Sequence, residues 1–246
     1  MTQKYRARIE YDGTAYYGFQ RQRDEYPTIQ GELEQALSHL AQQPVTVIGA
    51  GRTDSGVHAL GQVISFTIDW RHGVDALQRA LNANLPEDIV VLQLETATAA
   101  FHPRFDARRR AYVYHIYNAP VRSPIRRQYS WHVAVPLDVV AMNEAAAYLP
   151  GTHDLATFGQ PPQGDNSVRQ VFRAEWQRDE ALLSFYIEAN AFLYRMVRSI
   201  VGSLKLVGDG SWQVSDFVAA FASGDRSRSG TVAPAVGLYL VSVWYE

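Results

Sequence analysis

The sequence predicts an α+β protein made of two halves, the first with ferredoxin-like topology. Strand-like and helix-like hydrophobic patterns follow one another in the order β-α-β-β-α-β up to Leu94, and the same alternation returns more loosely after residue 108. With 246 residues, of which 47% are hydrophobic, the chain is long enough for one large domain or two small ones.

The first half opens with an alternating strand that Asp12 and Gly13 end. Thr28 can cap the helix that follows, in which Leu33, Leu37 and Leu40 have helical spacing. The remaining patterns are a short apolar strand, a half-buried alternating strand, a short helix and a last strand. The expected ranges are strands at 5–11, 45–48, 62–70 and 88–94 and helices at 28–40 and 75–82.

The second half has the same kinds of pattern with longer connections. Its helix at 192–207 is apolar almost all round, which predicts burial. The other expected elements are strands at 108–117, 168–176, 182–189 and 237–245 and helices at 137–149 and 215–222. We therefore expect an N-terminal α+β half of residues 1–100 and a C-terminal α+β half of residues 101–246.

Composition excludes several classes of protein. The chain has no cysteine, so disulfides, thiolate metal sites and cysteine nucleophiles are excluded. The N-terminus carries charges where a signal peptide would have an apolar run, and no segment approaches the roughly 18 apolar residues of a membrane span. We expect a soluble, cytoplasmic protein.

Arginine is concentrated in one part of a chain whose net charge is only −2. Its guanidinium suits bidentate phosphate contacts and stacking on bases, so this stripe can follow an RNA backbone. A solvated face, or a genome that favours arginine codons, explains the stripe equally well. The candidates for contact with an RNA backbone are Arg104, Arg108, Arg109, Arg110, Arg126 and Arg127; Arg122 belongs to the same stripe.

The most informative segment is GAGRTDSGVHA at residues 49–59. It has Asp54 where a dinucleotide-binding fingerprint needs its third glycine, and Val57-His58 where a P-loop needs Lys-Ser/Thr, so neither phosphate-binding motif is present. The seven histidines show no paired metal-ligand spacing, and we expect structural or surface roles for them; His58 is singled out because it lies within the motif.

Asp54 is the candidate catalytic residue, although an isolated aspartate between glycines can also form a simple Asx-turn. The apolar helix after Phe192 carries Arg195 and Arg198, and at least one of them is expected to point inward, where it needs a carboxylate partner. Pairing with Asp54 would keep that carboxyl ionised. An ionised carboxylate without a cofactor suits chemistry at a sugar anomeric carbon or an electrophilic base.

The segment at 49–59 resembles the signature of the tRNA pseudouridine synthase I family, commonly called TruA. Four further blocks resemble that family in the same order, so the resemblance covers nearly the whole chain. These blocks begin at Tyr11 (YDGT-Y-GFQ-Q), Phe101 (FH-RF), Phe192 (FL with MVR and Gly202) and Thr231 (T-APA-GL).

The resemblance implies two ferredoxin-like (RRM-like) α/β-sandwich halves with mostly antiparallel sheets and a cleft between them. It implies that Asp54 is catalytic and lies in the first half, and that the second half carries the base pocket. Arg52 would enter the space left by the flipped base, Tyr112 would stack on the base, Arg198 would pair with Asp54, and Leu238 would line the pocket.

The implied activity is isomerisation of uridine to pseudouridine at positions 38, 39 and 40 in the anticodon arm of tRNA. The resemblance also implies a homodimer and no cofactor or metal. Two alternatives remain open at this point. A non-catalytic RNA-binding module would keep the arginines but has no need of Asp54, and a nucleoside hydrolase would use Asp54 to release free uracil.

Overall fold

The structure is a computed structural model that describes residues 2–22, 26–161 and 164–246. It contains two compact units. The first unit comprises the described residues up to Arg108 together with Leu240–Glu246, and the second is Arg109–Tyr239. The division after residue 100 that the sequence suggests stays a prediction about domain boundaries.

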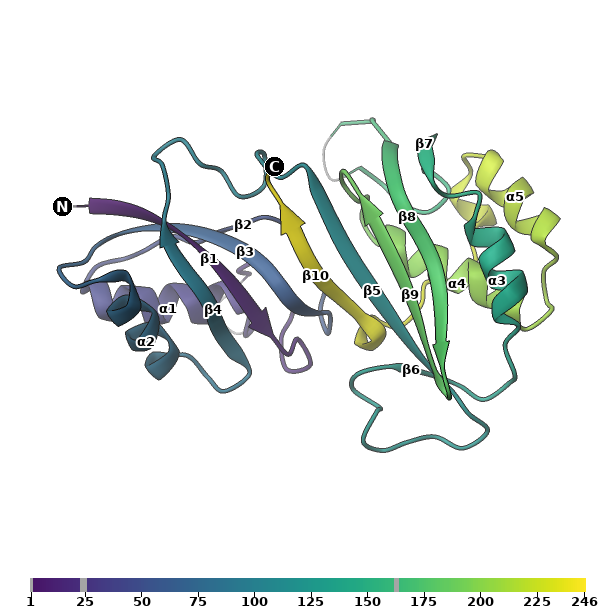
Figure 1. Cartoon of the computed structure of the whole chain (residues 1–246), viewed down its shortest axis with the longest axis horizontal. Helices are drawn as coiled ribbons and strands as arrows, with labels where there is room; N and C mark the ends of the chain where they lie inside the picture. The colour runs from purple at the N-terminus through teal and green to yellow at the C-terminus, as the bar shows by residue number, and fades with distance from the viewer. Residues whose placement is uncertain (1, 23–25, 162–163) are drawn as a thin grey trace. The chain divides into compact units, whose positions relative to one another are not determined.

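The first unit has the predicted β-α-β-β-α-β order. Its sheet has the order β4-β1-β3, antiparallel throughout, and the two-residue strand β2 pairs with β3 through Ile48 and Ser65. Helix α1 packs against β3 and α2 against β4 (Figure 1). The bounds are β1 Thr2–Tyr11, α1 Ile29–Ala41, β2 Ile48–Gly49, β3 His58–Asp69, α2 Val74–Asn84 and β4 Ile89–Thr96.

Local signals account for these elements. Thr28 caps α1 as predicted, since its hydroxyl accepts the Gly31 N–H at 3.2 Å. The strand expected at 45–48 is only partly present, because regular pairing begins at Ile48. Val45 and Val47 are buried without belonging to a strand, so the apolar run reflects core packing instead of strand pairing.

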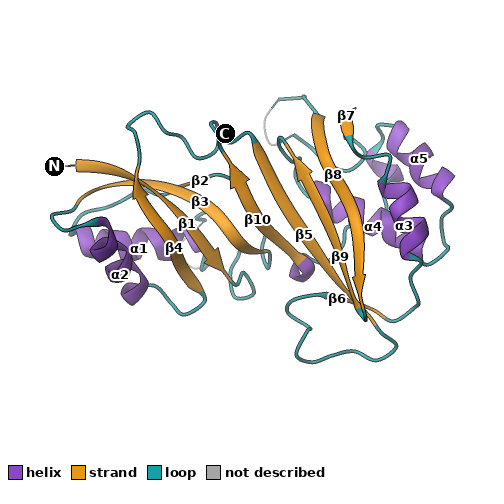
Figure 2. Ribbon diagram, in the orientation of Figure 1, coloured by secondary structure: helices purple, strands orange, loops and turns teal. Residues whose placement is uncertain are grey.

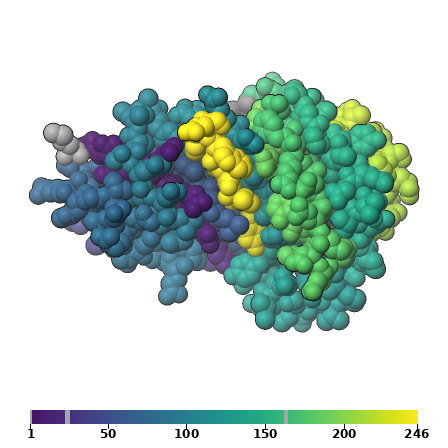
Figure 3. Space-filling model, in the orientation of Figure 1, coloured from purple at the N-terminus to yellow at the C-terminus, as the bar shows by residue number. Residues whose placement is uncertain are grey.

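The last strand, β10 (Leu238–Trp244), returns the chain to the first unit. From Leu240 onward it belongs to that unit and lies beside β3 in the sheet. The Arg108 N–H donates to the Trp244 carbonyl at 2.9 Å, which fixes the C-terminal end of the strand. In the space-filling view this segment, in yellow, lies at the surface (Figure 3).

The second unit has a sheet of order β5-β9-β8-β7 with antiparallel neighbours, while β6 pairs parallel to β5. Helices α3, α4 and α5 pack together, with α4 against β5 and α3 against β8 (Figure 2). The bounds are β5 Arg109–Asn118, β6 Trp131–Val133, α3 Val139–Ala146, β7 Gly151–Asp154, β8 Val168–Asp179, β9 Leu182–Ala189, α4 Met196–Gly208 and α5 Val214–Ala222.

Sequence reasoning placed the start of α4 incorrectly, at residue 192. The helix begins at Met196, because Arg195 adopts a left-handed conformation (φ 61°) and Tyr194 forms a bridge to Gln160. The predicted burial is confirmed, since Ile200, Val201 and Leu204 are fully buried. The short strands β6 and β7 were not predicted.

The predicted α+β class with mostly antiparallel sheets is confirmed. Each unit has its own core, which includes Ile9, Leu33 and Ile68 in the first and Phe158, Phe185 and Phe217 in the second. The expected cleft between the halves stays a prediction.

One partly buried side chain gives the second unit a pH dependence. Burial, with a smaller effect of Arg126, lowers the pKa of His115 on β5 to about 4, and its Nδ1 lies 2.9 Å from the Ser184 hydroxyl. In the unfolded chain this histidine takes up a proton near pH 6.5, whereas the folded protein resists protonation until about pH 4. The free energy of unfolding should therefore fall as the pH drops from 7 to 4, with this group contributing up to about 3 kcal/mol of the loss.

Urea unfolding at pH 7 and pH 4.5, compared between the wild type and His115→Gln, measures this contribution. The variant should lose clearly less stability over the interval, because glutamine takes up no proton. Equal losses in the two proteins would contradict the assignment. The comparison also cancels the contributions of carboxyl groups such as Asp154, whose pKa is lowered by the hydroxyl of Ser167.

Candidate active site

Asp54 lies in a tight loop of residues 50–57, here called the Asp54 loop, between β2 and β3. The Arg52 side chain is exposed, Asp54 is half-buried, and Thr53 between them is buried. The Val57 N–H donates to the Asp54 carbonyl at 3.1 Å and closes the turn. The Ala50 N–H donates to Val63 at 2.8 Å, which joins the start of the loop to β3.

The segment after β1 holds this loop in place. The Tyr11 hydroxyl lies 2.8 Å from the Thr53 hydroxyl, and the Phe19 N–H donates to the Thr53 carbonyl at 3.0 Å. The Ser55 hydroxyl donates to the Tyr16 carbonyl at 3.1 Å. The block that begins at Tyr11 and the segment at 49–59 therefore form one substructure. Hydrogen bonds fix the residues on both sides of Asp54.

Gly18 explains why the loop and this segment can approach so closely. Its φ of +94° is a conformation that L side chains rarely adopt, and a Cβ there would lie 2.8 Å from the Thr53 carbonyl oxygen. The sequence shows Gly18 only as one residue of the block that resembles the family. No pattern in it indicates that Gly18 lies against Thr53.

His58, at the start of β3, is 2% exposed. Its Nδ1 lies 3.1 Å from the backbone nitrogen of Gly13 and 3.0 Å from an Asp12 carboxylate oxygen. The side chain thus joins the end of β1 to the start of β3 directly beside the Asp54 loop. His58, which the sequence sets apart from the other histidines, thus has contacts that join two parts of the backbone.

The Tyr11–Thr53 contact can be measured by a double-mutant cycle. Tyr11→Phe and Thr53→Val each remove one hydroxyl with little change of shape, and each should lower the free energy of unfolding by about 1 kcal/mol. Because both variants break the same hydrogen bond, the double variant should lose about 1 kcal/mol less than the sum of the single losses. Additive losses would show that the two hydroxyls do not stabilise the loop jointly.

In the second unit, Arg198 is half-buried on the first turn of α4, whereas Arg195 is exposed. The Arg198 Nε donates to the Ala233 carbonyl at 2.7 Å, and the Ala233 N–H donates to the Arg198 carbonyl at 3.0 Å. This reciprocal pair orients the guanidinium. Of the two arginines, Arg198 is thus the one that turns toward the protein, as the argument from the apolar helix required.

Tyr112 and Leu238 both lie on strands of the second unit and are nearly buried, at 8% and 7% exposure. The Tyr112 ring packs edge-on against Phe192 at 4.8 Å between centroids. On the same face of β5, Tyr114 is fully buried and its hydroxyl donates to the Pro234 carbonyl at 2.8 Å. Burial raises the pKa of Tyr114, while the charge of Arg198 acts in the opposite direction.

The predicted site residues thus fall into two groups. Arg52 and Asp54 share one loop of the first unit, while Tyr112, Arg198 and Leu238 belong to the second. The pairing of Asp54 with Arg198 stays a prediction.

The predicted RNA-contacting arginines differ in their surroundings. Arg110 is mostly buried, and its Nη1 donates to the Asn190 carbonyl at 2.9 Å. Arg108, Arg109, Arg126 and Arg127 are exposed, and Arg104 is half-buried. Among them, Arg104 lies over Phe105, Arg109 over Phe172 and Arg126 over Tyr117, at 5.4–5.6 Å from the ring centres.

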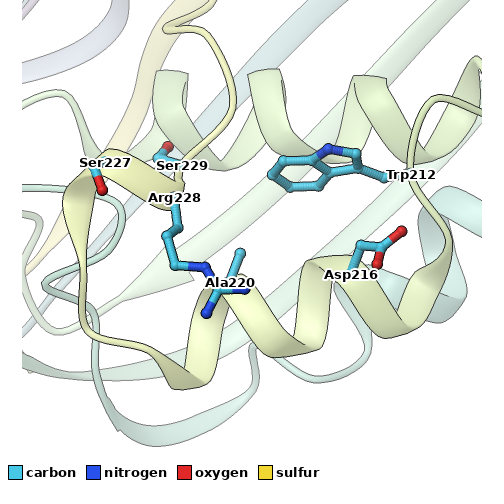
Figure 4. A pocket seen from close by; sticks show the side chains of 6 residues that line it. All are labelled: Trp212, Asp216, Ala220, Ser227, Arg228 and Ser229. Atoms are coloured by element: carbon cyan, nitrogen blue, oxygen red, sulfur yellow. The ribbon is translucent and has the colours of Figure 1, made fainter.

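A separate cavity of about 330 Å³ lies in the second unit between α5 and the segment at 227–229 (Figure 4). None of the predicted site residues lines it. Its Asp216 carboxylate accepts the Gln213 N–H at 2.8 Å and serves as part of the α5 capping box. The cavity is lined by Trp212, Asp216, Ala220, Ser227, Arg228 and Ser229.

Within residues 2–22, 26–161 and 164–246, no three histidine or acidic side chains group together as metal ligands would. Within the same part of the chain, no helix has the length and apolar character needed to cross a membrane.

Comparisons with known proteins agree with the resemblance seen in the sequence. A family model described as "tRNA pseudouridine synthase" matches residues 7–106 and 145–246. Among relatives named tRNA pseudouridine synthase A, that of Thermoanaerobacter sp. (strain X514) is 41% identical over 238 residues, 96% of this chain and 97% of the relative. That of Afipia carboxidovorans is 43% identical over 244 residues, 98% of this chain and 99% of the relative. The chain therefore belongs to the tRNA pseudouridine synthase family.

Proposed function

We propose that this protein isomerises uridine to pseudouridine at positions 38, 39 and 40 in the anticodon arm of tRNA. Family membership supports the reaction class and the substrate. The observation that carries the proposal within the structure is the Asp54 loop, which holds one carboxylate by hydrogen bonds on both of its flanking residues. An acid that only solvates a loop needs no such support.

In the proposed reaction the target nucleotide leaves the helical stack and enters the site, at a cost of a few kcal/mol. Asp54 assists cleavage of the N1–C1′ bond, and the uracil turns within the site. C5 then bonds to C1′, C5 loses its proton, and N1 takes one up. The reaction is redox-neutral, so it needs no electron donor or acceptor.

The other residues have positioning roles in this proposal. Arg52 is exposed at the tip of the Asp54 loop, where it can enter the space that the flipped base leaves. Tyr112 stacks on the base, Leu238 lines the pocket, and Arg198 pairs with Asp54. The bond from Arg198 Nε to Ala233 supports the last role, because it fixes the plane of the guanidinium.

A tRNA transcript labelled with tritium at uracil C5 tests the proposal. Pseudouridine formation releases tritium to water while the base stays attached to the strand. Release of free uracil would instead support a nucleoside hydrolase that uses Asp54. Binding of the transcript with no release of either kind would support a non-catalytic RNA-binding module, and both of these results would overturn the isomerase.

We also propose that the protein works as a homodimer in the cytoplasm, as the resemblance implies. Light scattering of the purified protein at micromolar concentration should give about twice the chain mass of 27.6 kDa. A mass equal to one chain at these concentrations would contradict the dimer.

A further inference from the structure

The loop between β5 and β6 forms a strongly basic surface that the proposed reaction does not use. No acidic residue lies between Asp106 and Asp138 in the sequence, whereas Arg122, Arg126 and Arg127 lie on this loop. All three arginine side chains are exposed. The loop extends beyond the ends of the strands of the second unit (Figure 1).

These arginines line a cavity of about 280 Å³, here called the arginine cavity. Another part of its wall is aromatic and comes from Tyr117 at the end of β5 and from Trp131 and His132 on β6. No acidic side chain lines it. Its volume lies just below the range for small-molecule sites, roughly 300–1,000 Å³, and is enough for part of one nucleotide.

Hydrogen bonds hold the wall of the cavity in position. The Arg126 carbonyl accepts the N–H groups of Tyr129 and Ser130, both at 3.0 Å, and Arg127 Nη1 donates to the Pro124 carbonyl at 3.0 Å. His132 Nε2 lies 2.8 Å from the Ala119 carbonyl, which ties β6 to the start of the loop. The loop is therefore ordered by its own contacts.

The two parts of the wall suit the two parts of one ligand. Guanidinium groups bind phosphate through planar, paired hydrogen bonds, and aromatic rings provide a surface on which a base can stack. The Arg126 guanidinium lies 5.5 Å from the centre of the Tyr117 ring, so the cationic and aromatic parts are in direct contact. The positive charge of Arg126 also extends to His115, where it helps to lower the pKa.

We propose that the arginine cavity binds one nucleotide of the RNA substrate, with the phosphate on the arginines and the base against the aromatic wall. This nucleotide is distinct from the one that is isomerised, because Tyr112, Arg198 and Leu238 do not line the cavity. The choice of RNA as the source rests on the proposed function, whereas the recognition of a nucleotide rests on the cavity alone. The site would hold an unpaired nucleotide, since only such a base can leave its neighbours and stack on protein.

Binding of uridine monophosphate to the purified protein, measured by saturation-transfer NMR, tests the cavity without requiring catalysis. Arg126→Gln and Arg122→Gln should each weaken binding by about fivefold or more, because each removes a charged phosphate contact. The matched control is Arg79→Gln, an exposed arginine on α2 in the first unit, which should leave binding unchanged. Equal binding of uridine monophosphate and inorganic phosphate would overturn the role of the aromatic wall.

The tritium assay with tRNA identifies the source of the nucleotide. Arg126→Gln should raise KM for tRNA by about fivefold or more while kcat stays within about twofold, because the variant loses binding and not chemistry. Weakened binding of the mononucleotide with an unchanged KM would show that the cavity takes a free nucleotide, which overturns the RNA assignment.

The two proposals can fail separately. The protein could bind the mononucleotide through these arginines and yet release no tritium from tRNA. That result would overturn the isomerase and still support a nucleotide site in the cavity. Normal tritium release together with no binding of the mononucleotide would overturn only the proposal about the cavity. The same holds if Arg122→Gln and Arg126→Gln bind the mononucleotide as tightly as the wild type.

Discussion

Asp54→Asn should abolish the release of tritium from C5-labelled tRNA, with a fall in rate of about a thousandfold or more, as is usual when the central group of a catalytic site is lost. The substitution keeps the size of the side chain, replaces one acceptor oxygen by an NH2 donor and removes the negative charge that acts on the sugar or the base. The loop should keep its shape, because Thr53 and Ser55 make the hydrogen bonds that hold it.

Binding of tRNA provides the control for this result. The dissociation constant of Asp54→Asn for unmodified tRNA should stay within a few-fold of the wild type, since most of the affinity for RNA comes from phosphate contacts elsewhere. If binding and activity fell to the same degree, Asp54 would have a structural role and the catalytic assignment would be wrong. The matched variant Asp75→Asn, on the exposed first turn of α2, should keep full activity.

Gly202→Ala should be the most destabilising of the small substitutions, lowering the free energy of unfolding by about 3 kcal/mol. Gly202 lies within α4, and a Cβ there would be only 1.7 Å from the carbonyl oxygen of Thr231. Because the obstacle is backbone, no side-chain rotation can relieve the clash, so the helix or the segment at Thr231 has to move. For a protein of this size the expected fall in Tm is roughly 6–12 °C.

The matched control for Gly202→Ala is Gly73→Ser. Gly73 is the N-cap of α2, nothing lies within 4 Å of a Cβ built there, and serine is a favourable N-cap residue. Scanning calorimetry should show little change or a small gain for this control. A Tm within 1–2 °C of the wild type for Gly202→Ala would contradict the assigned close packing.

The local shift that Gly202→Ala forces should also reduce activity below the melting temperature. The segment that begins at Thr231 carries Ala233, whose carbonyl accepts the hydrogen bond from Arg198 Nε. A shift of that segment therefore changes the orientation of a guanidinium proposed to pair with Asp54. Tritium release at 20 °C, where the variant is folded, measures this local effect separately from unfolding.

Elements with strong local signals could be predicted from the sequence. The threonine cap gave α1 close to its observed bounds, and the alternating residues gave the C-terminal end of β3, which begins four residues earlier than predicted, at His58. Strands β6 and β7 could not be predicted, because strands of three and four residues are too short for a periodic pattern. The start of α4 was misplaced since the apolar pattern continues through Arg195, where only the backbone angle ends the helix.

The candidate site shows a similar limit. Asp54 could be singled out because glycines and an arginine surround it in the sequence. The contact of Tyr11 with Thr53 joins residues 42 positions apart, and the Arg198–Ala233 contact joins residues 35 positions apart. A single sequence has no periodicity or motif that reports pairs at such separations. The aromatic wall of the arginine cavity could not be predicted either, because two of its residues lie on β6, a strand that the sequence does not predict.

The position of β10 has a consequence for the order in which the protein is made. Residues 109–239 lie between the bulk of the first unit and the segment Leu240–Glu246 that joins its sheet beside β3. At a translation rate of about 5–20 residues per second, that edge of β3 stays unpaired for roughly 10–30 s before its partner strand is synthesised. Unpaired edges recruit other strands. The unit whose synthesis begins first is therefore completed last, and nascent chains are most exposed to wrong pairing along β3 in that interval.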